Sequence, residues 1–358
     1  MRVFPAIALV ALLHAAVIHA DEAPPSKPPS LREAVDALTD ADLKELPQLL
    51  KDNFIKPESL GDEALSRAMV QGLIERLAPG ASLLPPPAPD TGEASPFKAE
   101  VIRDTVGYIR IGSLDAAHVT QLDATLDDFA GKKLNALVLD LRATPAGSEF
   151  EQATEVCKRF TPKGKVLFTV KKPNVREEQI LTSKDDPKYT GLLVALVDSD
   201  TAGAAEIVAA VLRTHVRAMV IGQRTRGEAV EFAQLPLPSG KLLRVAVAEA
   251  ALPGSAPVFP GGVKPDIAVE VSPEISAAVL KAELENGVAP LVAESERLKM
   301  NEAALVAGRN PELDAFQEAQ ARKGEKNPAL IRDVILQRAL DFITTITLYE
   351  KKPGRVAR

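Results

Sequence analysis

Short apolar segments alternate with helical segments along residues 98–270, and this alternation limits the folds open to the chain more than any other feature. Six segments have the length and apolar content of β-strands: 106–111, 136–141, 165–170, 192–197, 218–221 and 242–248. Helical patterns lie between several of them, at 115–131, 148–160 and 203–215. Because strands that are joined through helices form parallel pairs, the pattern predicts an α/β core with a largely parallel sheet.

Helical segments flank this core on both sides. An N-terminal helical segment at 30–84 begins with a capping box, in which Ser30 is followed by Glu33. We predict a proline-rich linker at 85–97, the core at 98–272 and a C-terminal helical region at 273–358. Apolar residues at helical spacing in 329–348 indicate either a docking face or, as we prefer, a face that packs on the core: Leu330, Val334, Leu340 and Ile343. The acidic stretch 283–302, which begins with Glu283, is interpreted as a solvated helix face.

The first 29 residues have the composition of an export signal. A charged start, an apolar run and a small residue at Ala20 predict a signal peptide at 1–20, followed by a mobile, proline-rich leader at 21–29. The apolar run is shorter than the roughly 20 residues of a membrane span, so a retained anchor is the less favoured alternative. We expect an exported protein, periplasmic or secreted, with no integral membrane segment after cleavage.

Composition excludes several classes of function. The 358 residues include 43 basic and 49 acidic ones, and the net charge of −6 argues against nucleic acid as a partner. A single cysteine excludes an internal disulfide and a thiolate metal cluster. Two of the four histidines lie in the first 20 residues, which leaves His118 and His215, too few for a multi-histidine metal site. We therefore predict no metal and no other cofactor, and nothing in the sequence indicates an oligomeric state.

Five motifs occur in one order between residues 107 and 266. They are Gly107-Tyr-Ile-Arg-Ile111, Leu139-Asp-Leu-Arg-Ala-Thr-Pro-Ala-Gly147, Thr201-Ala-Gly-Ala-Ala-Glu206, the set Arg217, Ala218, Gly222, Thr225 and Gly227, and Gly262-Val-Lys-Pro-Asp266. In this order they resemble the motifs of the C-terminal processing (tail-specific) peptidases, a serine peptidase family with a ClpP/crotonase-like core. The resemblance covers most of residues 50–270, and it implies that fold for the core.

The departures from the family fall on its chemistry. The resemblance implies a Ser/Lys dyad, in which a neutral lysine takes the proton of the attacking serine. The serine position is Gly203, the lysine position is Glu228 and a third position, glutamine in the family, is Phe232. The 25-residue spacing from Gly203 to Glu228 is the one that the family keeps. Glycine carries no nucleophile and a carboxylate is a weak base, so we predict a pseudo-peptidase that acts by binding.

Two other functions compete with this interpretation. One is an active serine-type endopeptidase with a displaced nucleophile, for which Ser148, Ser199 or Thr201 would need Glu228, His118 or His215 as a base. The other is an acyl-CoA enzyme on the crotonase-like relative of the fold, which the order of the motifs disfavours. Cys157, at a core position of a predicted helix, is interpreted as a buried apolar residue rather than a nucleophile.

Part of the family's site could survive as a binding feature. The resemblance places oxyanion-hole donors at the backbone of Ala146, Gly147 and Ala204, and these could hold a peptide C-terminal carboxylate. Glu228 opposes an anion unless Arg224 or Arg226 neutralises it; alternatively, Glu228 pairs with one of these arginines and the pocket is vestigial. About 17 residues separate Leu84 from the core at 102, too few for the PDZ domain that most of the family carries there. The predicted partner is a peptide C-terminus or a cell-envelope protein.

Overall fold

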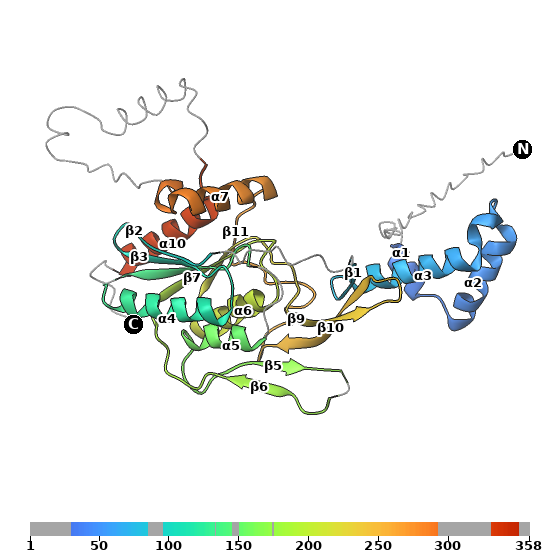
Figure 1. Ribbon diagram of the computed structural model, residues 1–358, viewed down its shortest axis with the longest axis horizontal. Helices are drawn as coiled ribbons and strands as arrows, with labels where there is room; N and C mark the ends of the chain where they lie inside the picture. The colour runs from blue at the N-terminus through green and yellow to red at the C-terminus, as the bar shows by residue number, and fades with distance from the viewer. Residues whose placement is uncertain are drawn as a thin grey trace, which may run out of the picture. The chain divides into compact units, whose positions relative to one another are not determined.

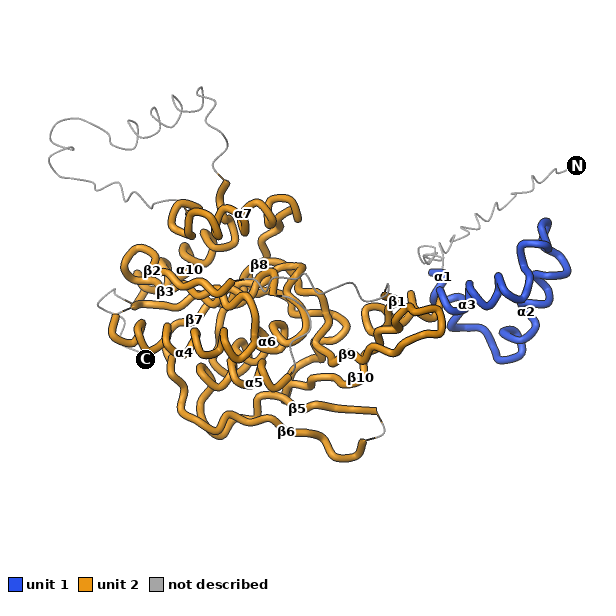
Figure 2. Tube along the Cα trace, in the orientation of Figure 1, with its two compact units in different colours: residues 1–71 blue, residues 72–358 orange. Residues whose placement is uncertain are grey.

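The computed structural model describes residues 30–84, 96–132, 134–144, 150–173, 175–292 and 331–350. The chain divides into two compact units, residues 1–71 and 72–358 (Figure 2). The predicted signal peptide and leader at 1–29, and most of the linker at 85–97, lie outside the described residues. Within the described ranges, no helix combines the length and the apolar content that a membrane crossing requires.

Local capping fixes the helices of the first unit. It contains α1 (Leu31–Asp36), α2 (Asp40–Asn53), a 3₁₀ turn (Pro57–Leu60) and the start of α3 (Asp62–Leu77), which ends in the second unit. The capping box of Ser30 and Glu33 is confirmed, and Thr39 with Asp42 forms a second one that we did not predict. None of the residues of these helices is buried. Caps and surface ion pairs such as Lys51–Asp62 (2.7 Å) therefore determine their local structure.

A six-stranded sheet forms the centre of the second unit (Figure 1). Its order is β11 (Ile267–Ala268), β8 (Met219–Gly222), β7 (Leu192–Val197), β4 (Ala136–Asp140), β3 (Val106–Arg110) and β2 (Lys98–Ile102). All pairs are parallel except β2 with β3. The predicted α/β fold with a parallel sheet is confirmed here, because the crossover helices α4 (Ala116–Ala130), α5 (Phe150–Lys158) and α6 (Ala204–Val216) lie where the sequence indicates them.

Each face of this sheet is covered by helices. Leu137 and Leu139 of β4 pack in one apolar cluster with α4, α5 and α6, whereas Ala136 and Val138 pack in a second cluster with α10 (Val334–Glu350). Figure 1 shows these helices on opposite sides of the strands. Leu340 and Ile343 of α10 are buried, so the face that we considered for docking packs on the core instead. Val334 is exposed and Leu330 lies outside the described residues.

A second, antiparallel sheet corrects the prediction of one sheet. It consists of β1 (Ala81–Leu84), β10 (Leu242–Ala251), β5 (Val166–Lys171) and β6 (Gln179–Thr182), with β9 (Val230–Pro236) paired to β10. β5 and β10 were predicted as strands, but β9 and β10 form a hairpin, which makes antiparallel pairs and not parallel ones. Residues 81–84 form β1, although we assigned 30–84 to a helical segment.

A buried network of charges connects the C-terminal region to the parallel sheet. Arg110 at the end of β3 donates to Glu283 of α7 (Pro273–Asn286; 2.6 Å) and to Asp140 (3.1 Å). Arg142 donates to Asp140 (2.6 Å) and to Asp333 (2.7 Å), just before α10. Glu283 is fully buried, so our interpretation of the acidic stretch as a solvated helix face is wrong for this residue, whereas Glu285 is exposed as expected. Residues 293–302 of that stretch lie outside the described part. The Glu283 carboxylate lies in the interior because it pairs with the buried Arg110.

This network predicts a loss of stability in acid. Burial alone would raise the pKa of Asp140, but Arg110, Arg142 and the Tyr108 hydroxyl hold it well below its ordinary value of 3.8. Because the folded-state pKa is the lower one, the unfolded state takes up the proton first as the pH falls. The stability that Asp140 contributes is therefore complete above its ordinary pKa and is lost as the pH falls towards the folded-state value. Urea unfolding below about pH 4 should show this decline, and an unchanged midpoint would contradict it.

Candidate functional site

The site begins at a sharp turn between β7 and α6. Gly203 is the residue before α6, and its backbone angles, φ 59° and ψ −124°, lie in a region that side-chain-bearing residues adopt only under strain. The resemblance described above assigns the family's serine to this position. The turn is thus present, with a residue that adopts it without strain and has no side chain.

Glu206 organises the backbone around this turn. Its carboxylate is buried and accepts hydrogen bonds from the N–H groups of Gly203 (3.0 Å), Gly227 (2.7 Å) and Glu228 (2.6 Å), and from the Thr225 hydroxyl (2.5 Å). Burial raises the pKa of Glu206, against the lowering effect of these donors. One side chain therefore connects the serine position and the lysine position through their main chains. From the sequence we identified Glu206 only as part of a motif, and we did not predict this function of its carboxylate.

Glycines hold the loop 222–228 close to its neighbours. A Cβ at Gly227, where φ is +80°, would lie 2.1 Å from the Pro260 carbonyl oxygen. A Cβ at Gly262 would lie 2.3 Å from the backbone carbonyl oxygen of Thr225. Both contacts are far too short, so only glycine permits this approach of backbone to backbone. The motif glycines thus hold the backbone of this loop close to its neighbours.

Gly203, Glu228 and Phe232 line one cavity of about 580 Å³. Its other walls come from α5, from the β5–β6 sheet and from the β9–β10 hairpin: Phe150, Glu151, Lys172, Gln179, Leu181, Val230, Glu231, Gln234, Arg244 and Val247. The three positions that the family resemblance assigned therefore lie together. This cavity is the candidate functional site.

Glu228 has a partner that the sequence did not indicate. Arg244 donates to its carboxylate (2.9 Å), and the same guanidinium lies 3.3 Å from the centre of the Phe232 ring.

Our expectation that Arg224 or Arg226 would neutralise Glu228 is wrong. Arg226 pairs with Asp200 (2.7 Å), and Arg224 donates to the Gly261 carbonyl (3.1 Å). In the antiparallel register of β9 and β10, Ala246 lies opposite Phe232. Arg244, two residues before Ala246, is therefore a diagonal neighbour of Phe232.

Apart from Glu228, the described candidates for a displaced nucleophile and its base lie elsewhere. The Thr201 hydroxyl is buried and donates to the Leu141 carbonyl (3.0 Å) and the Asp198 carboxylate (2.9 Å), while Ser199 is exposed. His118 contacts Asp115 (2.8 Å) on α4, and His215 lies at the far end of α6. None of these four described residues lines the cavity. Ser148 lies outside the described residues.

Two further predictions have partial outcomes. Of the oxyanion-hole positions, Ala146 and Gly147 lie outside the described residues, whereas Ala204 is the first residue of α6 and so its N–H has no acceptor within the helix. Cys157 is fully buried, as expected, and burial raises the pKa of its thiol far above the ordinary value. In the part of the chain that the structure describes, no group of His, Cys, Asp and Glu residues could hold a metal ion.

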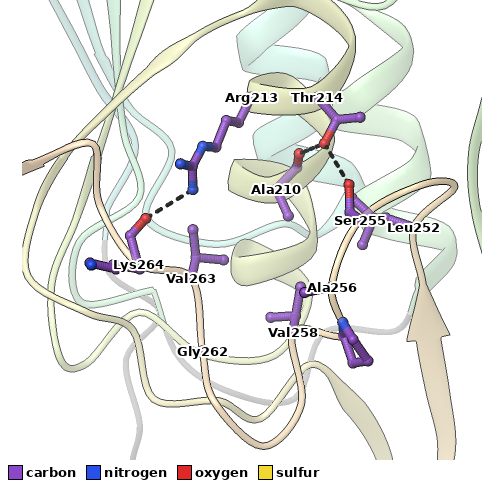
Figure 3. Close-up of a pocket in the computed structure, with 11 residues that line it drawn as sticks. Ala210, Arg213, Thr214, Leu252, Ser255, Ala256, Val258, Gly262, Val263 and Lys264 are labelled. Carbon is purple, nitrogen blue, oxygen red and sulfur yellow. Dashed lines mark hydrogen bonds between the residues drawn. The ribbon is translucent and has the colours of Figure 1, made fainter.

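A second cavity, of about 530 Å³, lies along the C-terminal half of α6 (Figure 3). Figure 3 shows Arg213 donating to the Lys264 carbonyl (3.0 Å) and Thr214 donating to the Ala210 carbonyl (2.8 Å). Neither Gly203 nor Glu228 lines it. It is therefore separate from the candidate site.

Comparison with known proteins agrees with the motif order. Residues 105–269 match the family model of peptidase family S41. These residues, called the S41 core below, are thus similar to that family. The S41 core is 29% identical over 170 residues to the carboxyl-terminal-processing protease of Picosynechococcus sp., a match that covers 48% of this chain and 40% of that protein. It is 31% identical over 176 residues to the carboxy-terminal-processing protease of Bartonella bacilliformis, covering 47% and 40%. The match thus spans about two fifths of these relatives.

Solved structures similar to the S41 core include two peptidases. The photosystem II D1 C-terminal processing protease has a TM-score of 0.41 and 24% identity, over 51% of this chain and 47% of that one. A putative peptidase from Parabacteroides merdae has a TM-score of 0.49 and 18% identity, over 61% and 79%.

Proposed function

We propose that this S41 core binds peptide or protein segments in the candidate site without hydrolysing them. The observation that carries the proposal is the cavity that contains Gly203, Glu228 and Phe232 together on an ordered scaffold. At the serine position there is no side-chain oxygen. At the lysine position the carboxylate is held by Arg244, and the ring of Phe232 packs beside it. Loss of nucleophile and base from one catalytic unit typically costs on the order of 10⁶ in kcat.

The proposal also includes the location of the protein, its division into segments and its ligand. We propose that residues 1–20 direct export to the periplasm or the medium and are removed. We also propose that the boundaries at 30, 85, 98 and 273 separate an N-terminal segment, whose helices are followed by β1, from the linker, the core and the C-terminal region. The proposed ligand is a peptide or a cell-envelope protein. The active alternative, a serine-type endopeptidase with a displaced nucleophile, receives less support because the Thr201 hydroxyl is bonded within the core.

The test compares hydrolysis by the natural chain and by a variant with the family's residues restored. Purified protein is incubated with an unfolded protein and with tailed peptides, and products are followed by mass spectrometry alongside fluorophosphonate labelling. The variant carries Gly203→Ser and Glu228→Lys, together with Arg244→Gln because a lysine at 228 would otherwise lie beside the Arg244 cation. We expect neither hydrolysis nor labelling by the natural chain, and measurable labelling of the variant.

Hydrolysis by the natural chain would contradict the proposal. If it persisted in Gly203→Ala, which leaves the glycine position without an oxygen, and disappeared in Ser199→Ala, the displaced-nucleophile alternative would be supported. A natural chain that neither hydrolyses nor binds any peptide would remove the binding function.

A further inference from the structure

The charges that line the candidate site are nearly all paired with one another. Arg244 pairs with Glu228 (2.9 Å), and Lys172 pairs with Glu231 (3.3 Å). Glu151, at the start of α5, makes no ion pair or hydrogen bond within the described residues and is exposed. The lining therefore contains three carboxylates and two cations, and the carboxylate left over is free to contact a ligand.

Backbone donors at the site are also largely occupied. The N–H groups of Gly203, Gly227 and Glu228 all donate to the Glu206 carboxylate, so these donors are not available to an anion of a ligand. The Ala204 N–H has no acceptor within α6, but Ala204 is buried and does not line the cavity. A peptide carboxylate would thus meet no unpaired cation among the described residues that line the cavity, and Glu151 would repel it.

The site also continues past Glu151. A neighbouring cavity of about 560 Å³ between α4 and α5 shares Glu151 and Leu181 with the candidate site. Its walls include Leu114 and Val119, and its one lysine, Lys158, pairs with Glu155 (2.5 Å). Because the two cavities share an edge, a bound peptide can extend from one into the other, and its C-terminus need not lie in the candidate site.

We infer that the candidate site accepts an internal, extended segment with a lysine or arginine side chain opposite Glu151, and does not recognise a free C-terminal carboxylate. The apolar walls, Phe150 and Leu181 among them, contact the aliphatic parts of such a segment. This inference rests on the proposed function, because it names the ligand class of the same site.

Three fluorescein-labelled heptapeptides test the inference by anisotropy with the full chain. The first is Ala-Leu-Ala-Lys-Leu-Ala-Val with a C-terminal amide, the second is the same peptide with a free carboxylate, and the third is the amide with Glu in place of Lys. We expect the lysine amide to bind about three- to fivefold more tightly than the glutamate amide, the magnitude of an exposed ion pair. The free carboxylate should bind no more tightly than the amide.

Variants assign the effect to Glu151. Glu151→Gln should reduce the preference for lysine to near one. Asp128→Asn, which removes a carboxylate of α4 that lines neither cavity, should leave the preference unchanged. A free carboxylate that binds more tightly than the amide, or a lysine preference that survives in Glu151→Gln, would overturn the inference and leave non-hydrolytic binding in place. Binding of none of the peptides would overturn the inference and the binding function together, and cleavage seen by mass spectrometry would overturn the proposed function on its own.

Discussion

Replacement of Glu283 by alanine is expected to lower the free energy of unfolding by about 3–5 kcal/mol, because it removes one of the two carboxylates that pair with the buried Arg110. Both carboxylate oxygens of Glu283 accept hydrogen bonds from Arg110, at 2.9 and 2.6 Å, and one also accepts from the Tyr108 hydroxyl (2.8 Å). Arg110 and Glu283 are almost entirely buried. Urea unfolding followed by circular dichroism would measure the change.

The matched control is Glu285→Ala, two residues further along α7. Glu285 is more than half exposed, and its contact with Lys281 is 4.0 Å long. Its removal should leave the unfolding midpoint unchanged within error. If Glu283→Ala were as stable as Glu285→Ala, the buried network would not hold the C-terminal region in place. Should Glu283→Ala fail to fold, Glu283→Gln, which keeps a hydrogen-bond acceptor, gives the smaller loss to compare with the same control.

Replacement of Glu206 by alanine is expected to have the second large effect, a loss of stability of about 4 kcal/mol or more. Three backbone N–H groups and one hydroxyl would lose their acceptor in a buried place, and each such loss typically costs about 1–3 kcal/mol. The loop at 225–228 would also lose its connection to the turn at Gly203. We therefore expect peptide binding at the candidate site to weaken in parallel, as measured by anisotropy.

Glu231→Ala serves as the comparison for Glu206→Ala. It removes a carboxylate that lines the candidate site, but one that is partly exposed and pairs with a surface lysine, Lys172. Its unfolding midpoint should stay within error of the natural chain's. Equal stability of the two variants would mean that Glu206 does not hold the site's backbone.

The sequence predicted the parallel strands well because strands covered on both faces form continuous apolar runs. Leu192–Val197 is an example, with five of its six residues buried. It failed for β2 and β9, whose polar residues and partial burial give no such run. The resemblance could assign the family's catalytic positions to Gly203, Glu228 and Phe232 because the motifs around them keep their order and spacing.

Partners distant in sequence could not be found in the same way. Arg224 and Arg226 are near Glu228 along the chain, and so we expected one of them as its partner. The loop that contains them directs Arg226 to Asp200, and the hairpin supplies Arg244 instead. Glu283 presents the same difficulty: nothing in its local sequence distinguishes a carboxylate that faces Arg110 from one that faces solvent. Pairings of this kind depend on how elements pack, and a single sequence contains no record of that.

The buried charges also indicate which residues this domain needs in order to fold by itself. The family match stops at residue 269, yet Arg110 and Arg142, both within it, have Glu283 and Asp333 as partners, both beyond it. A fragment cut at the edges of the motif block would bury two cations with only Asp140 between them. The matched segment is thus shorter than the segment that we expect to fold by itself. A truncated chain or a gene fusion that contained the motifs without α7 and α10 would keep the sequence features of the family, but we expect that it would not fold.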